Sequence, residues 1–304
     1  MPPLLLSALV FVAALALLVK SSDWLIGAAE EIGLGLGISP FVIGVTIVAL
    51  GTSLPELASS IAGVLDGESA IVTGNVIGSN VANICLVLGL TAVAAKGIRM
   101  DDSVVDIDVP IIIGSGVALW AVTYDGEVDL VDGLLLVGLL VVFLLSSFLS
   151  RPSMPGERVA TSWRAYVWLL VGGVGVYLGA RYTVSSVQEL SAAVGISSGV
   201  IAMSAVAIGT SLPEVLVSLA AARRGNASMA VGNVIGSNIF NSFGVLGIPA
   251  LIDTVEVPAE VGFSLYFMLG VTVVLGFLSV ASNVSRWEGA FLLGLYVMFL
   301  AELF

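Results

Sequence analysis

The sequence of 304 residues contains no histidine, a single cysteine (Cys85) and only two lysines, Lys20 and Lys96. Without histidine and with one thiol, the chain lacks the residues for a zinc or haem site, a disulfide framework or a histidine-dependent catalytic triad. The formal net charge of −12 also leaves no basic surface of the kind that binds nucleic acid.

Charged residues are scarce as well. They make up 11% of the chain, whereas hydrophobic residues make up 58% and the mean hydropathy is +1.13. A soluble domain carries about 25% charged residues, so this composition cannot cover a surface that faces water. We therefore expect a multi-pass protein of the cell membrane, surrounded by the lipid bilayer.

Ten apolar stretches are long enough to cross a bilayer, for which a helix needs about 20 residues. The first is interpreted as a helix of the mature protein and not as a signal peptide, because it lacks a basic start and a clear cleavage site. The predicted spans are residues 3–31, 39–64, 70–95, 105–124, 130–150, 164–191, 197–222, 227–252, 259–281 and 286–303.

The loops between these spans alternate in charge. Basic residues lie in one set, near residues 96–104, 150–164, 222–226 and 282–286. In the other set, near residues 65–69, 124–130 and 252–260, all the charged residues are acidic. The positive-inside rule places the basic loops in the cytoplasm, and with ten helices both termini then lie on the extracellular side.

Two segments recur at a constant offset of 158 residues. Residues 49–57 (ALGTSLPEL) recur as residues 207–215 (AIGTSLPEV), and residues 74–83 (GNVIGSNVAN) recur as residues 232–241 (GNVIGSNIFN). Each half of the chain then contains five helices, and an odd number inverts the second half relative to the first.

The predicted fold class is therefore an all-α integral membrane protein with two inverted five-helix repeats, an arrangement typical of secondary transporters. We expect residues 1–150 to form the first half, residues 151–163 a cytoplasmic linker, and residues 164–304 the second half.

Each GTSLPE motif places a glutamate, Glu56 or Glu214, inside a predicted span. An ionisable side chain is costly there and marks a functional site. The preceding residues, Pro55 and Pro213, have no backbone N–H, so each helix is expected to be interrupted and to offer carbonyl oxygens in the turn before the proline.

Further oxygen atoms share these helix faces. Ala49, Thr52 and Ser53 fall on one helical stripe with Glu56, and the GNVIGSN motif adds a serine and an asparagine one turn apart. All of these ligands are hard oxygens, which suits Ca²⁺ and also Na⁺, whereas Mg²⁺ retains its waters and demands a tighter octahedron.

The paired GTSLPE and GNVIGSN segments resemble the alpha-repeats of the cation/calcium exchanger superfamily, above all those of the compact prokaryotic sodium/calcium exchangers. The resemblance covers nearly the whole chain. It implies a ten-helix antiporter, not an enzyme, that exchanges Na⁺ for Ca²⁺ by alternating access, electrogenically at three Na⁺ per Ca²⁺. It implies no cofactor and no obligate protein partner.

By motif position, the resemblance implies that Glu56 and Glu214 are central carboxylates shared by Ca²⁺ and Na⁺, with Asn83 and Asn241 completing the cage. The other implied ligands are the backbone carbonyls of Thr52 and Thr210 and, at flanking sodium sites, the carbonyls of Ala49 and Ala207 with Ser53, Ser79, Ser211 and Ser237. Some family members have aspartate at the position of Asn241. The amide here leaves the cage at −2 and leaves potassium dependence open.

Other functions stay open at this point. On the same fold, an exchanger of Ca²⁺ for H⁺ would use the two glutamates to carry protons, and a channel would conduct without a counter-ion. An intramembrane hydrolase with Ser53 or Ser211 as nucleophile is disfavoured, because no histidine is present and no lysine lies in a matching span.

Overall fold

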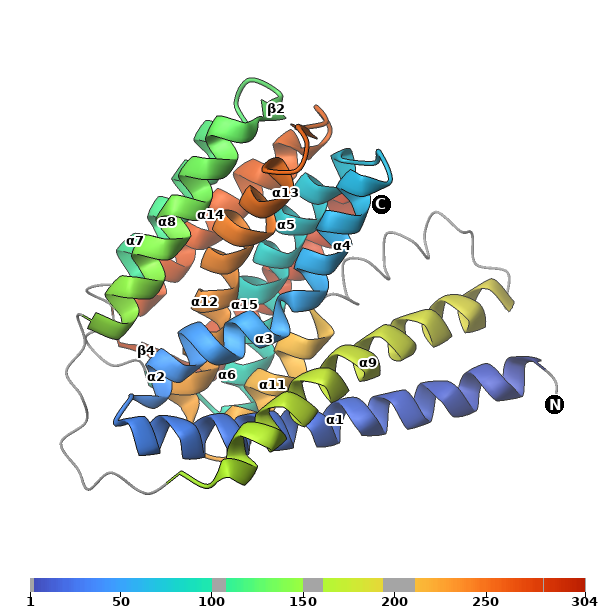
Figure 1. The fold of residues 1–304 in the computed structure, drawn as a ribbon, viewed down its shortest axis with the longest axis vertical. Helices are drawn as coiled ribbons and strands as arrows, with labels where there is room; N and C mark the ends of the chain where they lie inside the picture. Colours follow the sequence, from blue (N-terminus) through green and yellow to red (C-terminus); the bar gives the residue numbers. More distant parts are fainter. Residues whose placement is uncertain (1–2, 100–107, 150–160, 194–210, 281, 304) are drawn as a thin grey trace.

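The computed structural model describes residues 3–99, 108–149, 161–193, 211–280 and 282–303, and these residues are almost entirely helical (Figure 1). The helical segments of the first half are α1 (Pro3–Leu36), α2 (Pro40–Ile43), η1 (Gly44–Val48), α3 (Ala49–Thr52), α4 (Leu54–Leu65), α5 (Ala70–Ala82), η2 (Asn83–Leu88), α6 (Gly89–Ala95), α7 (Val109–Val122) and α8 (Leu130–Leu149). Those of the second half are α9 (Trp163–Ala193), α11 (Leu212–Arg223), α12 (Ala227–Phe240), η4 (Asn241–Val245), α13 (Gly247–Ala250), α14 (Val261–Ser279) and α15 (Arg286–Leu303). The three η segments are π-helical.

Within the described residues, five helices are long and apolar enough to cross a membrane, and six if the bent pair Pro40–Thr52 and Leu54–Leu65 is one span. Three of the predicted spans consist of α-helical and π-helical segments in series, which the hydrophobic pattern did not predict. Each of the ten predicted ranges holds at least one helix in its described part, while the count of ten membrane crossings stays a prediction.

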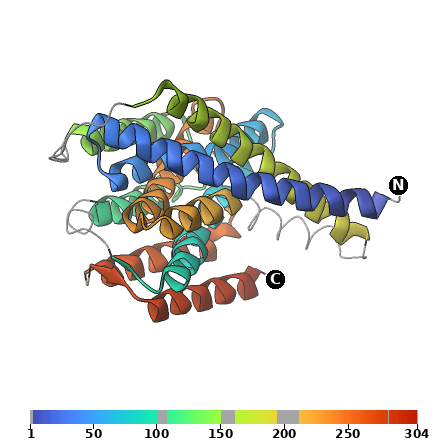
Figure 2. The ribbon, with the colours of Figure 1, turned by 90° about the horizontal axis from the view of Figure 1, so that it is seen from below.

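Two long helices, α1 and α9, cross each other and run obliquely against the remaining bundle (Figures 1 and 2). Small residues let them approach closely: a Cβ added at Gly172 would lie 2.7 Å from the Leu25 nitrogen, and one at Gly179 would lie 2.8 Å from the Leu18 Cα. The apolar side chains between this pair and α2, η1, α11 and α12 form a second buried cluster, separate from the main core of the bundle.

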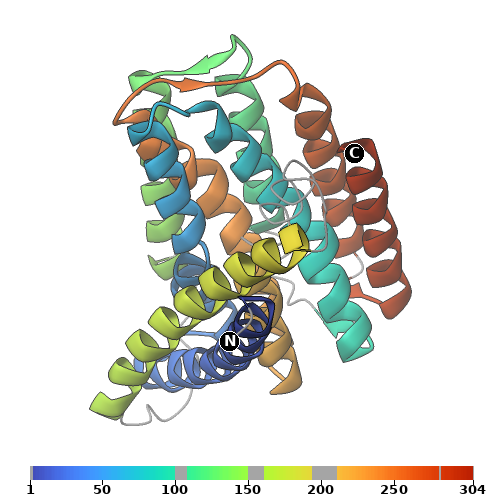
Figure 3. The same ribbon diagram turned by 90° about the vertical axis from the view of Figure 1, so that its right-hand side faces the viewer.

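Two short antiparallel ribbons join the two halves. Strand β1 (Ile98–Arg99) pairs with β4 (Asn283–Val284), and β2 (Glu127–Val128) pairs with β3 (Val255–Glu256). Figure 1 labels β2 and β4 at opposite ends of the bundle, and Figure 3 shows the β2–β3 ribbon beyond the helix ends. The two ends differ in charge, because Lys96, Arg99 and Arg286 lie near β1–β4 whereas Glu127 and Glu256 lie in β2–β3.

The GNVIGSN segment of the second half packs directly on the backbone of the first half. A Cβ added at Gly232 in α12 would lie 2.5 Å from the Phe41 oxygen and 2.9 Å from the Val45 nitrogen, and one at Gly236 would lie 2.7 Å from the Ala49 Cβ. The glycines of this motif therefore serve close helix approach, as small residues do in membrane bundles.

Replacing Gly232 with valine is expected to destabilise the protein by about 1–3 kcal/mol, because the added side chain would overlap α2 and η1. Thermal unfolding of the detergent-solubilised protein measures this loss. Gly270→Val is the matched control, since a Cβ there meets no described atom within 4 Å. Equal unfolding temperatures for the two variants would contradict the packing described here.

Candidate functional site

In the first half the interruption predicted at the proline lies at Ser53, two residues before Pro55; in the second half the residues before Ser211 lie outside the described part of the chain. Between α3 and α4, Ser53 has φ −89° and ψ 3°, and the chain bends by 41°. Ser211, before α11, has nearly the same backbone angles, φ −84° and ψ 0°. Both halves thus begin a new helix at the same point of the motif, with proline in the first turn, where its missing N–H costs nothing.

Glu56 and Glu214 lie in the first turns of α4 and α11 and are 1% and 0% exposed. A helix N-terminus favours a carboxylate at both positions. Ser53 Oγ donates a hydrogen bond of 3.3 Å to Glu214 Oε1. Within the described residues, both carboxylate oxygens of Glu56 and Oε2 of Glu214 have no hydrogen-bond partner.

Asn83 and Asn241 are the first residues of the π-helical segments η2 and η4. They are 1% and 0% exposed, and neither end of either side-chain amide finds a partner in the described part of the chain. Buried amides are normally hydrogen-bonded. Single π-helical turns within α-helices are frequent at functional sites, and here they interrupt repeat-related helices at repeat-related residues.

Thr52 connects the two halves. Its Oγ1 lies 3.2 Å from Asn233 Oδ1 and 3.4 Å from Ser237 Oγ, and it also lies 3.3 Å from the carbonyl oxygen of Ala49. That carbonyl accepts the Ser53 N–H at 3.0 Å as well. The first GTSLPE motif therefore contacts the second GNVIGSN motif directly.

The structure places four of the predicted ligands in contact across the two halves. Hydrogen bonds join Thr52 to Ser237 and Ser53 to Glu214 across the two halves. Ten of the twelve predicted residues are buried, with at most 3% exposure: Ala49, Thr52, Ser53, Glu56, Ser79, Asn83, Ser211, Glu214, Ser237 and Asn241. The other two, Ala207 and Thr210, lie outside the described residues.

Four polar residues that sequence reasoning missed lie beside the glutamates. Asn75 Nδ2 donates to Ser60 Oγ at 3.0 Å, and Asn233 Nδ2 donates to Ser218 Oγ at 2.9 Å. The signal was present in the sequence, because each serine follows its motif glutamate by one helical turn and both pairs recur at the same offset as the motifs.

The unpaired oxygens indicate what the site can bind. An isolated buried carboxylate is strongly unfavourable unless a cation or a proton neutralises it. In the described residues, no group of three or more acidic, histidine or cysteine side chains gathers. The Glu214 carboxylate contacts the Ser53 hydroxyl, and the other side chains buried on these helices offer hydroxyl and amide oxygens. Such a set fits a hard cation.

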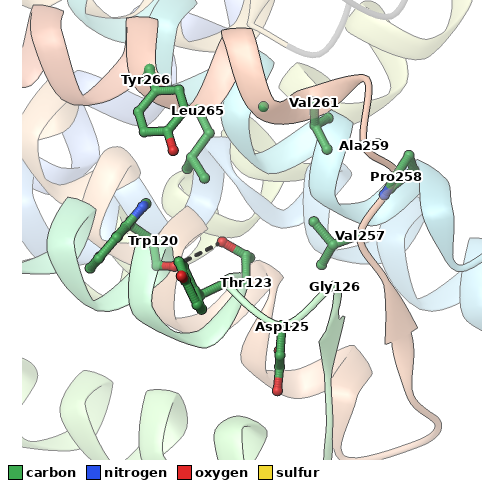
Figure 4. A pocket seen from close by; sticks show the side chains of 12 residues that line it. Trp120, Thr123, Asp125, Gly126, Val257, Pro258, Ala259, Val261, Leu265 and Tyr266 are labelled. Atoms are coloured by element: carbon green, nitrogen blue, oxygen red, sulfur yellow. Dashed lines mark hydrogen bonds between the residues drawn. The ribbon is translucent and has the colours of Figure 1, made fainter.

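A surface pocket of about 340 Å³ lies elsewhere, where α7 ends and α14 begins (Figure 4). Its lining includes Trp120, Tyr124, Asp125 and Tyr266 and none of the predicted ligands. Aromatic side chains at the end of an apolar helix are typical of the membrane interface. Because its lining contains none of the predicted ligands, the pocket is separate from the site around the glutamates.

The family model described as "Sodium/calcium exchanger protein" matches residues 6–149 and 164–304. The chain belongs to this family. It is 33% identical over 346 residues to sodium/calcium exchanger MaX1 of Methanosarcina acetivorans, with 97% of this chain and 98% of that protein covered. It is also 33% identical over 320 residues to inner membrane protein YrbG of Escherichia coli K12, covering 99% of this chain and 98% of that one.

Solved structures of the sodium–calcium exchanger NCX_Mj have the same fold as this chain. One of them, soaked with 10 mM Na⁺ and zero Ca²⁺, superposes with a TM-score of 0.90 at 32% identity, covering 99% of this chain and 100% of that chain. This protein is thus a multi-pass cell membrane protein of the cation/calcium exchanger type.

The two repeat-related serines make different contacts in this exchanger, and this gives a prediction. Ser53→Ala is expected to destabilise the cation-free protein by about 1–3 kcal/mol, because it removes the hydrogen bond to the Glu214 carboxylate. Ser211→Ala should have a much smaller effect, since Ser211 Oγ has no partner within the described residues. Thermal unfolding in a chelating buffer compares the two, and equal losses would refute the assigned contact.

Proposed function

We propose that this protein is a secondary active antiporter that exchanges Na⁺ for Ca²⁺ across the membrane by alternating access. The observation that carries the proposal is the pair of repeat-related glutamates, Glu56 and Glu214, both buried and both with oxygens that lack a partner in the described residues. Membership of the exchanger family and the names of its relatives support the choice of Na⁺ and Ca²⁺.

In this proposal Glu56 and Glu214 are ligands of both ions, and Asn83 and Asn241 supply amide oxygens to the same cage. The unpaired amides of the two asparagines support that role. Carbonyl oxygens of Thr52 and Thr210 complete the central site. The flanking sodium ligands are the carbonyls of Ala49 and Ala207 and the hydroxyls of Ser53, Ser79, Ser211 and Ser237.

The charge of the cage explains why transport is coupled. Two ionised glutamates give −2, which one Ca²⁺ or two Na⁺ neutralise, while three Na⁺ leave +1. An empty cage would expose two carboxylates to a medium of low dielectric constant during the conformational change, at a cost of several kcal/mol. Only loaded carriers therefore reorient, and the result is obligate exchange.

The moving part in this proposal is the α1–α9 pair, which slides against the rest of the bundle. The two helices of the pair contact each other closely through small residues, and the pair meets the bundle through a hydrophobic cluster separate from the main core; both features support such a movement. We further propose ten membrane helices in two inverted halves, residues 1–150 and 164–304, joined by a cytoplasmic linker at 151–163. The basic β1–β4 end would face the cytoplasm, and both termini would lie outside.

The direct test is uptake of radioactive Ca²⁺ into proteoliposomes loaded with Na⁺, compared with vesicles loaded with K⁺ or choline. Uptake is expected only with Na⁺ inside. Glu56→Gln and Glu214→Gln should each abolish it, because the cage then lacks the charge that balances Ca²⁺.

Glu302→Gln is the matched control, since Glu302 is an exposed residue near the end of α15 and should leave uptake unchanged. Uptake that ignores Na⁺ but follows an acid-inside gradient would replace Na⁺ with H⁺ on the same site. Sodium-driven uptake that survives in Glu56→Gln would contradict the proposed role of the carboxylates.

The proposed stoichiometry makes a separate prediction about voltage. If three Na⁺ leave for each Ca²⁺ that enters, one positive charge leaves the vesicle per cycle, worth about 2.3 kcal/mol per 100 mV. An inside-positive potential, set with K⁺ and valinomycin, should accelerate Ca²⁺ uptake, and an inside-negative one should slow it. A rate independent of the potential would indicate electroneutral exchange.

A further inference from the structure

Each glutamate-bearing helix is held by an asparagine from the next long helix. Asn75 on α5 donates through Nδ2 to Ser60 Oγ at 3.0 Å and to the backbone oxygen of Glu56 at 3.2 Å. All three residues are buried, with at most 4% exposure. A single amide group therefore bonds to α4 at two points, the backbone of Glu56 and, one turn later, the hydroxyl of Ser60.

The second half repeats the contact with the repeat-related residues. Asn233 on α12 donates through Nδ2 to Ser218 Oγ at 2.9 Å, and Ser218 lies one turn after Glu214. Asn233 Oδ1 meanwhile accepts the Thr52 hydroxyl at 3.2 Å. This amide uses both ends, so it fixes α11 of its own half and the end of α3 in the other half.

We propose that Asn75 and Asn233 are positioning residues that hold the two carboxylates at the separation which a bound cation requires. The assignment rests on the proposed function, because it presumes that Glu56 and Glu214 bind the transported ion. Neither asparagine is itself among the proposed ligands.

The physical need for such residues comes from the helix interruptions. At Ser53 the chain bends by 41°, and α4 begins there as a new helix with proline in its first turn. The new helix carries a buried carboxylate in its first turn. Hydrogen bonds from α5 and α12 fix the position of the glutamate-bearing helices, because both amides attach to the face that carries the glutamate.

Another asparagine on α12 provides a matched control. Asn238 is as buried as Asn233, at 2% exposure, but its Nδ2 bonds to the Val234 oxygen of its own helix at 2.7 Å. Asn238→Ala removes the same chemical group from the same helix without releasing either glutamate-bearing helix.

The experiment compares Asn75→Ala, Asn233→Ala and Asn238→Ala in the full-length protein. Three quantities are measured: the Ca²⁺ concentration that half-saturates thermal stabilisation in detergent, and the KM and maximal rate of Ca²⁺ uptake into Na⁺-loaded vesicles. Asn75→Ala and Asn233→Ala should raise both Ca²⁺ concentrations about tenfold, the combined effect of the two hydrogen bonds that each amide makes. Asn238→Ala should leave them unchanged.

A double-mutant cycle tests the contact itself. Asn233→Ala and Ser218→Ala together should weaken Ca²⁺ binding no more than Asn233→Ala alone, because both substitutions remove the same hydrogen bond between Asn233 and Ser218. Lower unfolding temperatures with an unchanged half-saturating Ca²⁺ concentration would overturn the proposal and assign the amides to helix packing only. If Asn233→Ala does not fold, Ser218→Ala alone decides by the same criterion.

Failure of the proposed function gives a different result. In that case wild-type protein is stabilised by a cation other than Ca²⁺, or Na⁺ does not drive its uptake. The comparison among the three asparagines is then made with the cation that does stabilise the protein. A wild-type protein that no cation stabilises would overturn both proposals together.

Discussion

Two buried carboxyl groups, those of Glu56 and Glu214, are the constraint around which this structure is arranged. A carboxylate in a low-dielectric interior is tolerated only when a cation, a proton or several donors compensate it. Glu214 receives one hydroxyl donor from Ser53, and Glu56 receives none from the described residues. The described residues thus supply too few donors to balance the two carboxyl groups, and a bound cation can balance them instead. Each half of the chain contributes one of these groups.

The helix interruptions and the close contacts follow from this constraint. Ending one helix at Thr52 and starting the next at Leu54 places Glu56 at a helix N-terminus, where the backbone dipole favours a negative charge. The glycines of α12 let the first half approach closely enough for Thr52 to reach Asn233. The site therefore depends on backbone breaks within one half and on tight packing between the two.

Much of this arrangement could be predicted from the sequence, because the two motifs recur at a constant offset and so identify the two halves. Glu56 and Glu214 stand out since a charge within an apolar span needs a reason, and their burial agrees with that expectation. The π-helical turns at Asn83 and Asn241 could not be predicted, because hydrophobic periodicity does not distinguish them from α-helix. Asn75 and Asn233 were missed for a different reason: hydrogen bonds across helices depend on how the helices pack.

The most direct test of the central claim is calorimetric titration of Ca²⁺ into the purified protein, with and without Na⁺. The account predicts that Ca²⁺ binds, that Na⁺ competes with it, and that replacing both glutamates with glutamine removes the binding. Ca²⁺ binding that is indifferent to Na⁺, or that survives the double replacement, would contradict it.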